Sequence, residues 1–230
     1  MSNKITLLFG DCYKELEKLP DKSVDLIITD PPYEITIQGG GALGTKYKEH
    51  FSQLNKLTHG VTNELLDMLV DKMKKINIYI YCNKIQVPKY LKYFVEQRKV
   101  FFDILTWHKT NPIPTVNNKY LTDTEYILFF REKGVKVYGD YTTKKTYYLT
   151  PLNTKDKKLY NHPTVKPVDQ ISNFIINSSN KGELVLDPFM GSGTVGVACS
   201  RLDRKFIGIE IDEQYFKTAD DRIATEGMCW

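Results

Sequence analysis

The strongest limit on the fold of this 230-residue chain is the alternation of short apolar runs with helical patterns. Several runs are continuously apolar, which is typical of strands buried on both faces. Strands that alternate with helices indicate an α/β fold, with an open, mostly parallel sheet covered by helices on both sides. The expected strands are Ile5–Phe9, Val24–Thr29, Ile76–Cys82, Asp103–His108, Glu125–Arg131, Glu183–Leu186 and Phe206–Ile211. The expected helices are Cys12–Leu19, an apolar stripe from Val61 to Met73, Val87–Gln97, Val168–Ser178, Thr194–Arg201 and Glu213–Thr225.

Two features interrupt this pattern. No helical pattern joins Asp103–His108 to Glu125–Arg131, so these two runs are expected to pair as an antiparallel hairpin at an edge of the sheet. The segments 34–60 and 133–163 lack apolar periodicity, and long segments of this kind are usually functional loops or disordered.

Composition excludes several classes of protein. With 41% hydrophobic and 26% charged residues, the chain is neither disordered nor of low complexity. No apolar stretch approaches the 18 residues of a membrane span. The four cysteines lie far apart, without zinc-site spacing, so we expect no metal site and a reduced protein in the cytoplasm.

Positive charge is concentrated in one segment. The formal net charge of the chain is +4, yet residues 131–160 alone carry eight basic and three acidic residues. A local basic stretch indicates a polyanion site, although a solvated lysine-rich loop explains the charge equally simply.

The first motif with a chemical meaning is Asp30-Pro31-Pro32-Tyr33, which directly follows an expected buried strand. Two prolines fix the backbone and remove two N–H donors, so the Asp30 carboxylate and the Pro31 carbonyl form a rigid pair of acceptors beside an aromatic ring. A flat heterocycle with an exocyclic amino group suits this arrangement, since it donates two hydrogen bonds and stacks on Tyr33. The alternative is a stiff turn without a ligand.

The second motif is an apolar strand, a glycine turn and a helix. Gly191, Gly193 and Gly196 match the spacing of a nucleotide-binding turn, and Glu210 follows 19 residues after Gly191 at the end of the next strand. An acid in that position suits ribose hydroxyls. The unit 183–212 is therefore interpreted as a βαβ site for a nucleoside cofactor.

Charge separates the two candidate cofactors. A dinucleotide such as NAD brings a pyrophosphate, which the Asp187 carboxylate beside the turn would repel. The cationic amine and sulfonium of S-adenosylmethionine (SAM) suit this carboxylate, so SAM is favoured while NAD remains open.

Taken together, these motifs resemble those of the β-class DNA amino-methyltransferases, in which Asp-Pro-Pro-Tyr precedes Phe-x-Gly-x-Gly. The resemblance covers residues from about 5 to 225. Further segments that are similar to family motifs are Gly10-Asp11-Cys12, Trp107–Pro112 and His162-Pro163-Thr164-Val165-Lys166-Pro167.

The resemblance implies a Rossmann-like SAM-methyltransferase fold, a circularly permuted, seven-stranded sheet with one antiparallel strand. It implies one catalytic domain over residues 1–230, with a mobile loop at 34–60 and a basic target-recognition insertion at 131–163. The implied catalytic residues are Asp30, Pro31, Pro32 and Tyr33. The implied cofactor-binding residues are Asp11, Thr164, Lys166, Asp187, Phe189, Gly191, Gly193, Thr194 and Glu210, with Thr164 and Lys166 near the SAM carboxylate. The expected DNA contacts are Lys133, Lys136, Lys144, Lys145, Lys155, Lys157 and Lys158.

The implied activity is methyl transfer from SAM to the exocyclic N6 of adenine in double-stranded DNA, at a specific site. Asp at the first position of the catalytic motif favours adenine in this family, and cytosine N4 is the alternative target. A non-catalytic DNA-binding module and an NAD enzyme are the competing classes. The resemblance also suggests a homodimer and a cognate restriction endonuclease as partners.

Overall fold

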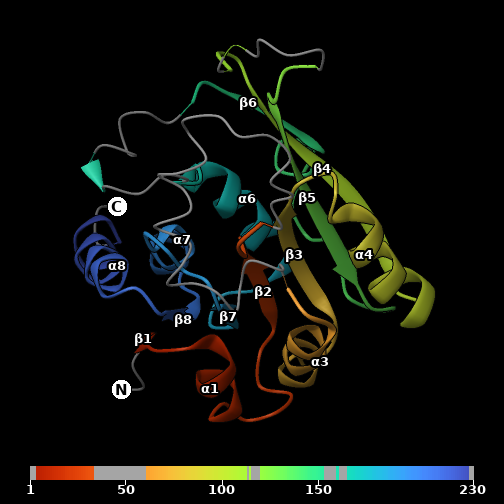
Figure 1. Ribbon diagram of the computed structural model, residues 1–230. Coiled ribbons are helices and arrows are strands. Elements are labelled where there is room, and N and C mark those ends of the chain that lie inside the picture. Colours follow the sequence, from red (N-terminus) through yellow and green to blue (C-terminus); the bar gives the residue numbers. More distant parts are fainter. Residues whose placement is uncertain are drawn as a thin grey trace, which may run out of the picture.

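The computed structural model describes residues 4–33, 61–112, 114, 120–152, 159–160 and 165–227. Its centre is one eight-stranded sheet in the order β1-β8-β7-β2-β3-β5-β4-β6 (Figure 1). The strands are β1 (Ile5–Phe9), β2 (Leu26–Thr29), β3 (Asn77–Cys82), β4 (Phe101–Lys109), β5 (Thr124–Arg131), β6 (Tyr147–Thr150), β7 (Leu184–Asp187) and β8 (Lys205–Glu210).

The topology confirms the expected class of fold and corrects its strand count. Strand β5 runs antiparallel to both of its neighbours, β3 and β4, and every other pairing is parallel. The antiparallel pair β4–β5 was predicted, but it does not form the edge of the sheet. The eighth strand, β6, pairs with Thr106–Lys109 of β4 and occupies that edge.

Strand β6 was not predicted because its own residues carry little signal. Tyr147 and Leu149 are exposed, and the preceding residues are threonines and lysines. An edge strand has one neighbour and little burial, so pairing with β4, rather than apolar patterning, places it.

Helices cover both faces of the sheet. One layer comprises α1 (Cys12–Glu17), α3 (Asn63–Lys72), α4 (Val87–Leu91) and η2 (Lys92–Gln97), and the other comprises α6 (Val168–Ser178), α7 (Thr194–Arg201) and α8 (Glu213–Glu226) (Figure 1). The segment predicted as one helix over 87–97 ends as a π-helix. Among the described residues, no helix is long and apolar enough to cross a bilayer.

The two layers of the core follow from the alternation of side chains along the central strands. In β3, Ile78, Ile80 and Cys82 pack toward α3 and α4, whereas Tyr79 and Tyr81 pack toward α6. A strand that is apolar at every position can be buried only between two helical layers, which explains the continuous apolar runs.

Candidate active site at the acidic edge of the sheet

Three neighbouring strands end in, or directly before, a carboxylic acid. Asp187 and Glu210 are the last residues of β7 and β8, and Asp30 follows the last residue of β2. Because β8, β7 and β2 are adjacent and parallel, the three acids meet at one edge of the sheet, here called the acidic edge. Ligands of open α/β sheets bind outside the carboxyl ends of the strands.

The two oxygens of Asp30 have different surroundings. Oδ2 accepts an ion-paired hydrogen bond from Lys166, whose side chain is 7% exposed. Oδ1 is buried and accepts no hydrogen bond from the described residues, while the nearby Tyr33 hydroxyl acts with Lys166 against the rise in pKa that burial gives the carboxyl group. A buried acceptor without a partner is costly, so Oδ1 is a position where a donor from a ligand gains most.

Four charged side chains form an alternating chain that ends at Asp30. Lys109 contacts Glu125 Oε1 at 2.5 Å, and Lys166 lies 3.3 Å from Glu125 Oε2 while it contacts Asp30. Tyr81 places its ring 4.8 Å from the Lys166 ammonium. Buried charges persist when they are paired in this way.

Burial and charge compete in setting the pKa of each member. Burial raises the pKa of Asp30, and the Lys166 ammonium opposes this shift without cancelling it. Burial acts against ionised Glu125 as well, but Lys166 and Lys109 outweigh it and lower the pKa of that carboxyl group. For Lys166, the two carboxylates outweigh burial and raise the pKa of the ammonium. The Lys166 ammonium therefore remains charged near neutral pH.

The Asp-Pro-Pro-Tyr segment brings its aromatic side chain to the same place. The Tyr33 hydroxyl donates to Glu125 Oε2 at 3.4 Å, and burial, followed by the charge of Asp30, raises the pKa of that hydroxyl. Pro31 is buried and Pro32 is half-buried. All four residues of the motif thus lie at the acidic edge beside the charged chain.

The cofactor residues that the sequence predicts gather around the neighbouring strands. A small pocket at the ends of β1 and β8 is lined by Asp11, Phe189 and Glu210, among others. Glu210 is held by backbone amides: Gly191 donates to Oε2 and Ile211 to Oε1, each at 2.9 Å. Asp11 caps α1 through the amide of Tyr13 at 3.1 Å.

Asp187 is the most deeply buried acid of this edge, at 4% exposure. Its Oδ1 accepts the backbone N–H of Phe189 at 3.1 Å. Burial raises the pKa of Asp187 to about 8, because the amide hydrogen bond offsets only part of the desolvation and the charge of Asp30 adds to it. A bound cation beside this carboxyl group would favour its ionised form.

Two residues of the glycine turn have roles within the protein. Gly193 has a φ of +76°, and a Cβ there would lie 2.9 Å from the Cβ of Ala219 in α8. The Thr194 hydroxyl accepts a hydrogen bond from the buried Arg222 at 3.0 Å. Gly191, with a φ of +50°, also requires the left-handed region.

The expected cofactor contacts of Lys166 and Thr164 stay predictions. The Lys166 ammonium is engaged by Asp30 and Glu125, and Thr164 lies outside the described residues. Residues 34–60 also lie outside the described residues, as do Lys155, Lys157 and Lys158.

The remaining lysines of the basic segment lie at two positions, both away from the acidic edge. Lys133 and Lys136 follow the end of β5, which pairs with Asn77 at the start of β3, so they lie opposite the acidic edge. Lys144 and Lys145 are exposed and precede β6, whose first residue pairs with Thr106 midway along β4. Thr143 beside them donates to Asn177 near the end of α6, so these two lysines do not reach the acidic edge either. Contact of Lys133 and Lys136 with a ligand at the acidic edge stays a prediction that this geometry does not favour.

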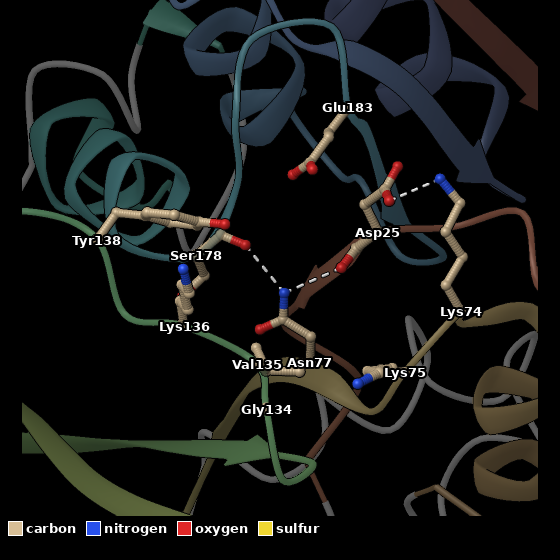
Figure 2. Close-up of a pocket in the computed structure, with 10 residues that line it drawn as sticks. All are labelled: Asp25, Lys74, Lys75, Asn77, Gly134, Val135, Lys136, Tyr138, Ser178 and Glu183. Atoms are coloured by element: carbon tan, nitrogen blue, oxygen red, sulfur yellow. Dashed lines mark hydrogen bonds and ion pairs between the residues drawn. The ribbon is translucent and has the colours of Figure 1, made fainter.

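A larger cavity, of about 170 Å³, lies at the edge opposite the acidic one, and Figure 2 shows the side chains that line it. Asn77 Nδ2 donates to the carbonyl oxygens of Asp25 and Ser178, each at 2.9 Å, and thereby ties β2, β3 and α6 together. Both carboxylates that line the cavity have partners: Asp25 pairs with Lys74 at 2.7 Å, and Glu183 accepts a hydrogen bond from the backbone N–H of Asn180. We interpret this cavity as a structural junction.

Sequence reasoning missed Glu125 and Lys109. Lys109 belongs to the Trp107–Pro112 segment that resembles a family motif, but no role was implied for it. Glu125 begins an otherwise apolar strand, and only the antiparallel pairing of β4 with β5 sets it opposite Trp107 and near Lys109. No local pattern links either residue to Lys166, 41 positions after Glu125.

Comparison with known proteins identifies the family of the chain. A family model described as "DNA methylase" (N6_N4_Mtase) matches residues 24–221. The Type II methyltransferase M2.DpnII of Streptococcus pneumoniae is 30% identical, over 97% of this chain and 91% of that protein. The Type II methyltransferase M2.LlaDCHI of Lactococcus lactis subsp. cremoris is 31% identical, over 96% and 91%.

Solved structures show the same fold. The M1.HpyAVI–SAM complex superposes with a TM-score of 0.69 at 28% identity, over 95% of this chain and 98% of that one. The PvuII DNA methyltransferase, described as cytosine-N4-specific, gives a TM-score of 0.69 at 18% identity, over 98% and 93%, which is a likeness of fold alone. The family model covers well over half of the residues, and the chain therefore belongs to the DNA methylase family of SAM-dependent N6 and N4 amino-methyltransferases.

Proposed function

We propose that this protein transfers the methyl group of SAM to the exocyclic N6 of adenine in double-stranded DNA, as the modification enzyme of a Type II restriction–modification system. The observation that carries the proposal is the asymmetry of Asp30, whose Oδ2 is held by Lys166 while the buried Oδ1 has no partner among the described residues. An amino group supplies the missing donor.

Asp30 and Pro31 would act on the target amine as a pair of acceptors. The lone pair of an exocyclic amine is delocalised into its ring, so the amine is a poor nucleophile. Two hydrogen bonds, from its two N–H groups to Asp30 Oδ1 and the Pro31 carbonyl, favour a pyramidal nitrogen with a localised lone pair. Pro31 and Pro32 keep these acceptors rigid, and positioning of this kind contributes much of an enzyme's rate.

Tyr33 would complete the base site by stacking. A base in duplex DNA must leave the helix to reach Asp30, at a cost of a few kcal/mol. Stacking on an aromatic ring is worth about 1–3 kcal/mol and offsets part of that cost. The hydrogen bond from the Tyr33 hydroxyl to Glu125 would hold the ring beside the two acceptors, Asp30 Oδ1 and the Pro31 carbonyl.

The cofactor would lie along the ends of β1, β7 and β8. When bound, SAM would supply an electrophilic methyl group on sulfur: the N–C bond forms as the C–S bond breaks, the sulfur keeps the bonding pair as a neutral thioether, and the proton that the nitrogen loses passes to water. Asp187 suits the methionine amine, Glu210 the ribose hydroxyls, and Asp11 the adenine end of the small pocket. Phe189, Gly191 and Gly193 suit the methionine part, with Thr194 behind the turn and Thr164 expected near the carboxylate.

The choice of adenine over cytosine rests on Asp30, since family members that methylate cytosine N4 tend to have Ser at this position. The Type II relatives support a place in restriction–modification and a cognate endonuclease as the functional partner. A homodimer remains part of the proposal through the family resemblance. Lys144 and Lys145 lead into β6, which runs toward the acidic edge, and we propose that these two lysines contact DNA phosphates.

The decisive experiment measures transfer of labelled methyl from SAM to unmethylated DNA, with nucleoside analysis of the product. We expect N6-methyladenine. Asp30→Ala should reduce transfer by at least about 100-fold, the scale expected when a preorganised site no longer makes a transition-state hydrogen bond, while the Kd for SAM stays within a few-fold of wild type.

Asp103→Ala is the matched control, because Asp103 is an exposed acid on β4 of the same sheet and lies away from the acidic edge. N4-methylcytosine in the product would show that the target base is cytosine and not adenine. A wild-type rate for Asp30→Ala would refute the role of Asp30 as an acceptor for the target amine.

A further inference from the structure

The chain Lys109–Glu125–Lys166–Asp30 draws on four separate parts of the sequence. Lys109 ends β4, Glu125 lies in β5, Asp30 follows β2, and Lys166 precedes α6, where Pro167 caps the helix. These side chains are between 7% and 23% exposed, and the pairs Lys109–Glu125 and Lys166–Asp30 each carry no net charge. The arrangement places one ammonium on the oxygen of Asp30 that the proposed amine does not use.

An acceptor role makes demands on Asp30 that its surroundings oppose. Burial favours the protonated acid, and the negative charge of Glu125 acts in the same direction. A protonated carboxyl group presents a donor and only one full acceptor, and it would lose most of its attraction for an amine. Lys166 is the cation in contact with Asp30 that favours the ionised form.

We propose that Lys166 and Glu125 are positioning residues for Asp30: Lys166 fixes Oδ2 and keeps the carboxyl group ionised, and Glu125, held by Lys109, keeps Lys166 in place. This inference rests on the proposed function for its catalytic consequence. It differs from the role that the family resemblance suggests for Lys166, which is contact with the SAM carboxylate.

The other titratable groups that face this cluster have defined charge states near neutral pH. Tyr81 and Cys82 of β3 are buried and neutral near pH 7, because burial raises the pKa of each. Tyr33 is neutral for the same reason, since burial also raises the pKa of its hydroxyl. Asp187 at the end of β7 adds negative charge only as it ionises, since its pKa is raised to about 8. Lys166 and Glu125 are therefore the charges closest to Asp30 that can be changed separately.

Because Lys166 and Glu125 carry opposite charges, removing each charge should shift the titration of Asp30 in opposite directions. Lys166→Met removes a positive charge beside Asp30, so the carboxyl group should titrate about 1–3 pH units higher. Glu125→Gln removes a negative charge, so the same group should titrate lower than in the wild type. General loosening of the fold would move both variants in one direction.

The first measurement is ¹³C NMR titration of aspartate-labelled protein, with Asp30→Asn used to assign the Asp30 carboxyl signal. It needs neither DNA nor methyl transfer, so it gives a result even if the proposed function is wrong. Asp103→Asn is the control. It removes the 3.6 Å pair between Asp103 of β4 and Arg131 of β5, which lies at the end of these strands away from the Lys109–Glu125 pair, and it should leave the Asp30 signal unchanged. Equal titration midpoints in wild type and Lys166→Met would overturn the inference.

The second measurement is the pH dependence of single-turnover methyl transfer. In Lys166→Met the acid limb should move to higher pH, with a Kd for SAM that stays close to that of wild type, and Lys166→Arg should restore most of the wild-type profile. An unmoved acid limb combined with a large loss of SAM affinity would assign Lys166 to the cofactor carboxylate instead. Inactivity of the wild type on DNA would refute the proposed function alone.

Discussion

At the scale of single residues, three acids on one edge of the sheet acquire different properties from their neighbours. Asp30 contacts an ammonium, whereas Glu210 is held by backbone amides. Asp187 has one amide and deep burial, and its pKa rises to about 8. All three residues are carboxylic acids, two aspartates and one glutamate, so the environment of each decides how readily it ionises near neutral pH.

Asp187 gives the folded protein a pH-dependent stability. Its folded pKa, about 8, lies above the ordinary 3.8, so between these values the folded state binds a proton that the unfolded state has released. Stability must therefore fall as pH rises through this interval, by at most about 1.4 kcal/mol per pH unit for one proton. Urea denaturation at pH 5 and pH 8 should show a smaller loss for Asp187→Asn than for wild type.

Asp203→Asn is the control for that prediction. Lys181 and Lys4 lower the pKa of this exposed acid, so it is ionised throughout the interval in both folded and unfolded states. Its substitution should leave the pH dependence unchanged. If wild type and Asp187→Asn showed equal falls in stability between pH 5 and pH 8, the raised pKa of Asp187 would be incorrect.

At the scale of elements, the turn between β7 and α7 combines the geometry that a cofactor turn is expected to have with helix packing. Gly193 adopts a positive φ, and α8 approaches so closely that a side chain at this position meets Ala219. The glycine pattern that predicts a cofactor turn is thus also required by the contact between α7 and α8. One residue satisfies both demands, and sequence spacing alone does not separate them.

Two glycine substitutions separate backbone strain from the contact with α8. Gly182 has a φ of +80°, and no atom lies within 4 Å of the position that a Cβ would occupy there, so Gly182→Ala should cost roughly 1–2 kcal/mol through strain alone. Gly193→Ala carries the same strain plus overlap with Ala219, and should cost about 1–3 kcal/mol more. Urea denaturation measures both. Equal costs would mean that α8 moves away freely.

At the scale of the whole molecule, the sheet sorts the basic segment into two groups. The chain leaves β5 at the edge opposite the acidic one, where Lys133 and Lys136 lie, and Lys144 and Lys145 come just before β6, which begins midway along β4. The net charge of residues 131–160 therefore overstates the positive charge available to DNA at Asp30.

This sorting predicts different effects of two double variants on DNA affinity. Lys144→Gln with Lys145→Gln should weaken binding and reduce the slope of log Kd against log salt by about 1–2, or close to one for each phosphate that the variant no longer neutralises. Lys133→Gln with Lys136→Gln removes the same charge at the far edge and should leave the slope unchanged. An equal reduction in both would place DNA along the entire segment.

The sequence by itself determined the order of the helices and of every strand except β6, the α/β class and the two motifs, because each depends on local spacing: apolar periodicity, prolines after a strand, glycines in a turn. Only the tertiary structure decided which distant residues meet. Glu125, Lys109 and Lys166 reach Asp30 because β4 and β5 pair antiparallel beside β3 and α6 begins above them. Burial there changes the free energy of each charge, and no stretch of sequence taken alone contains that burial.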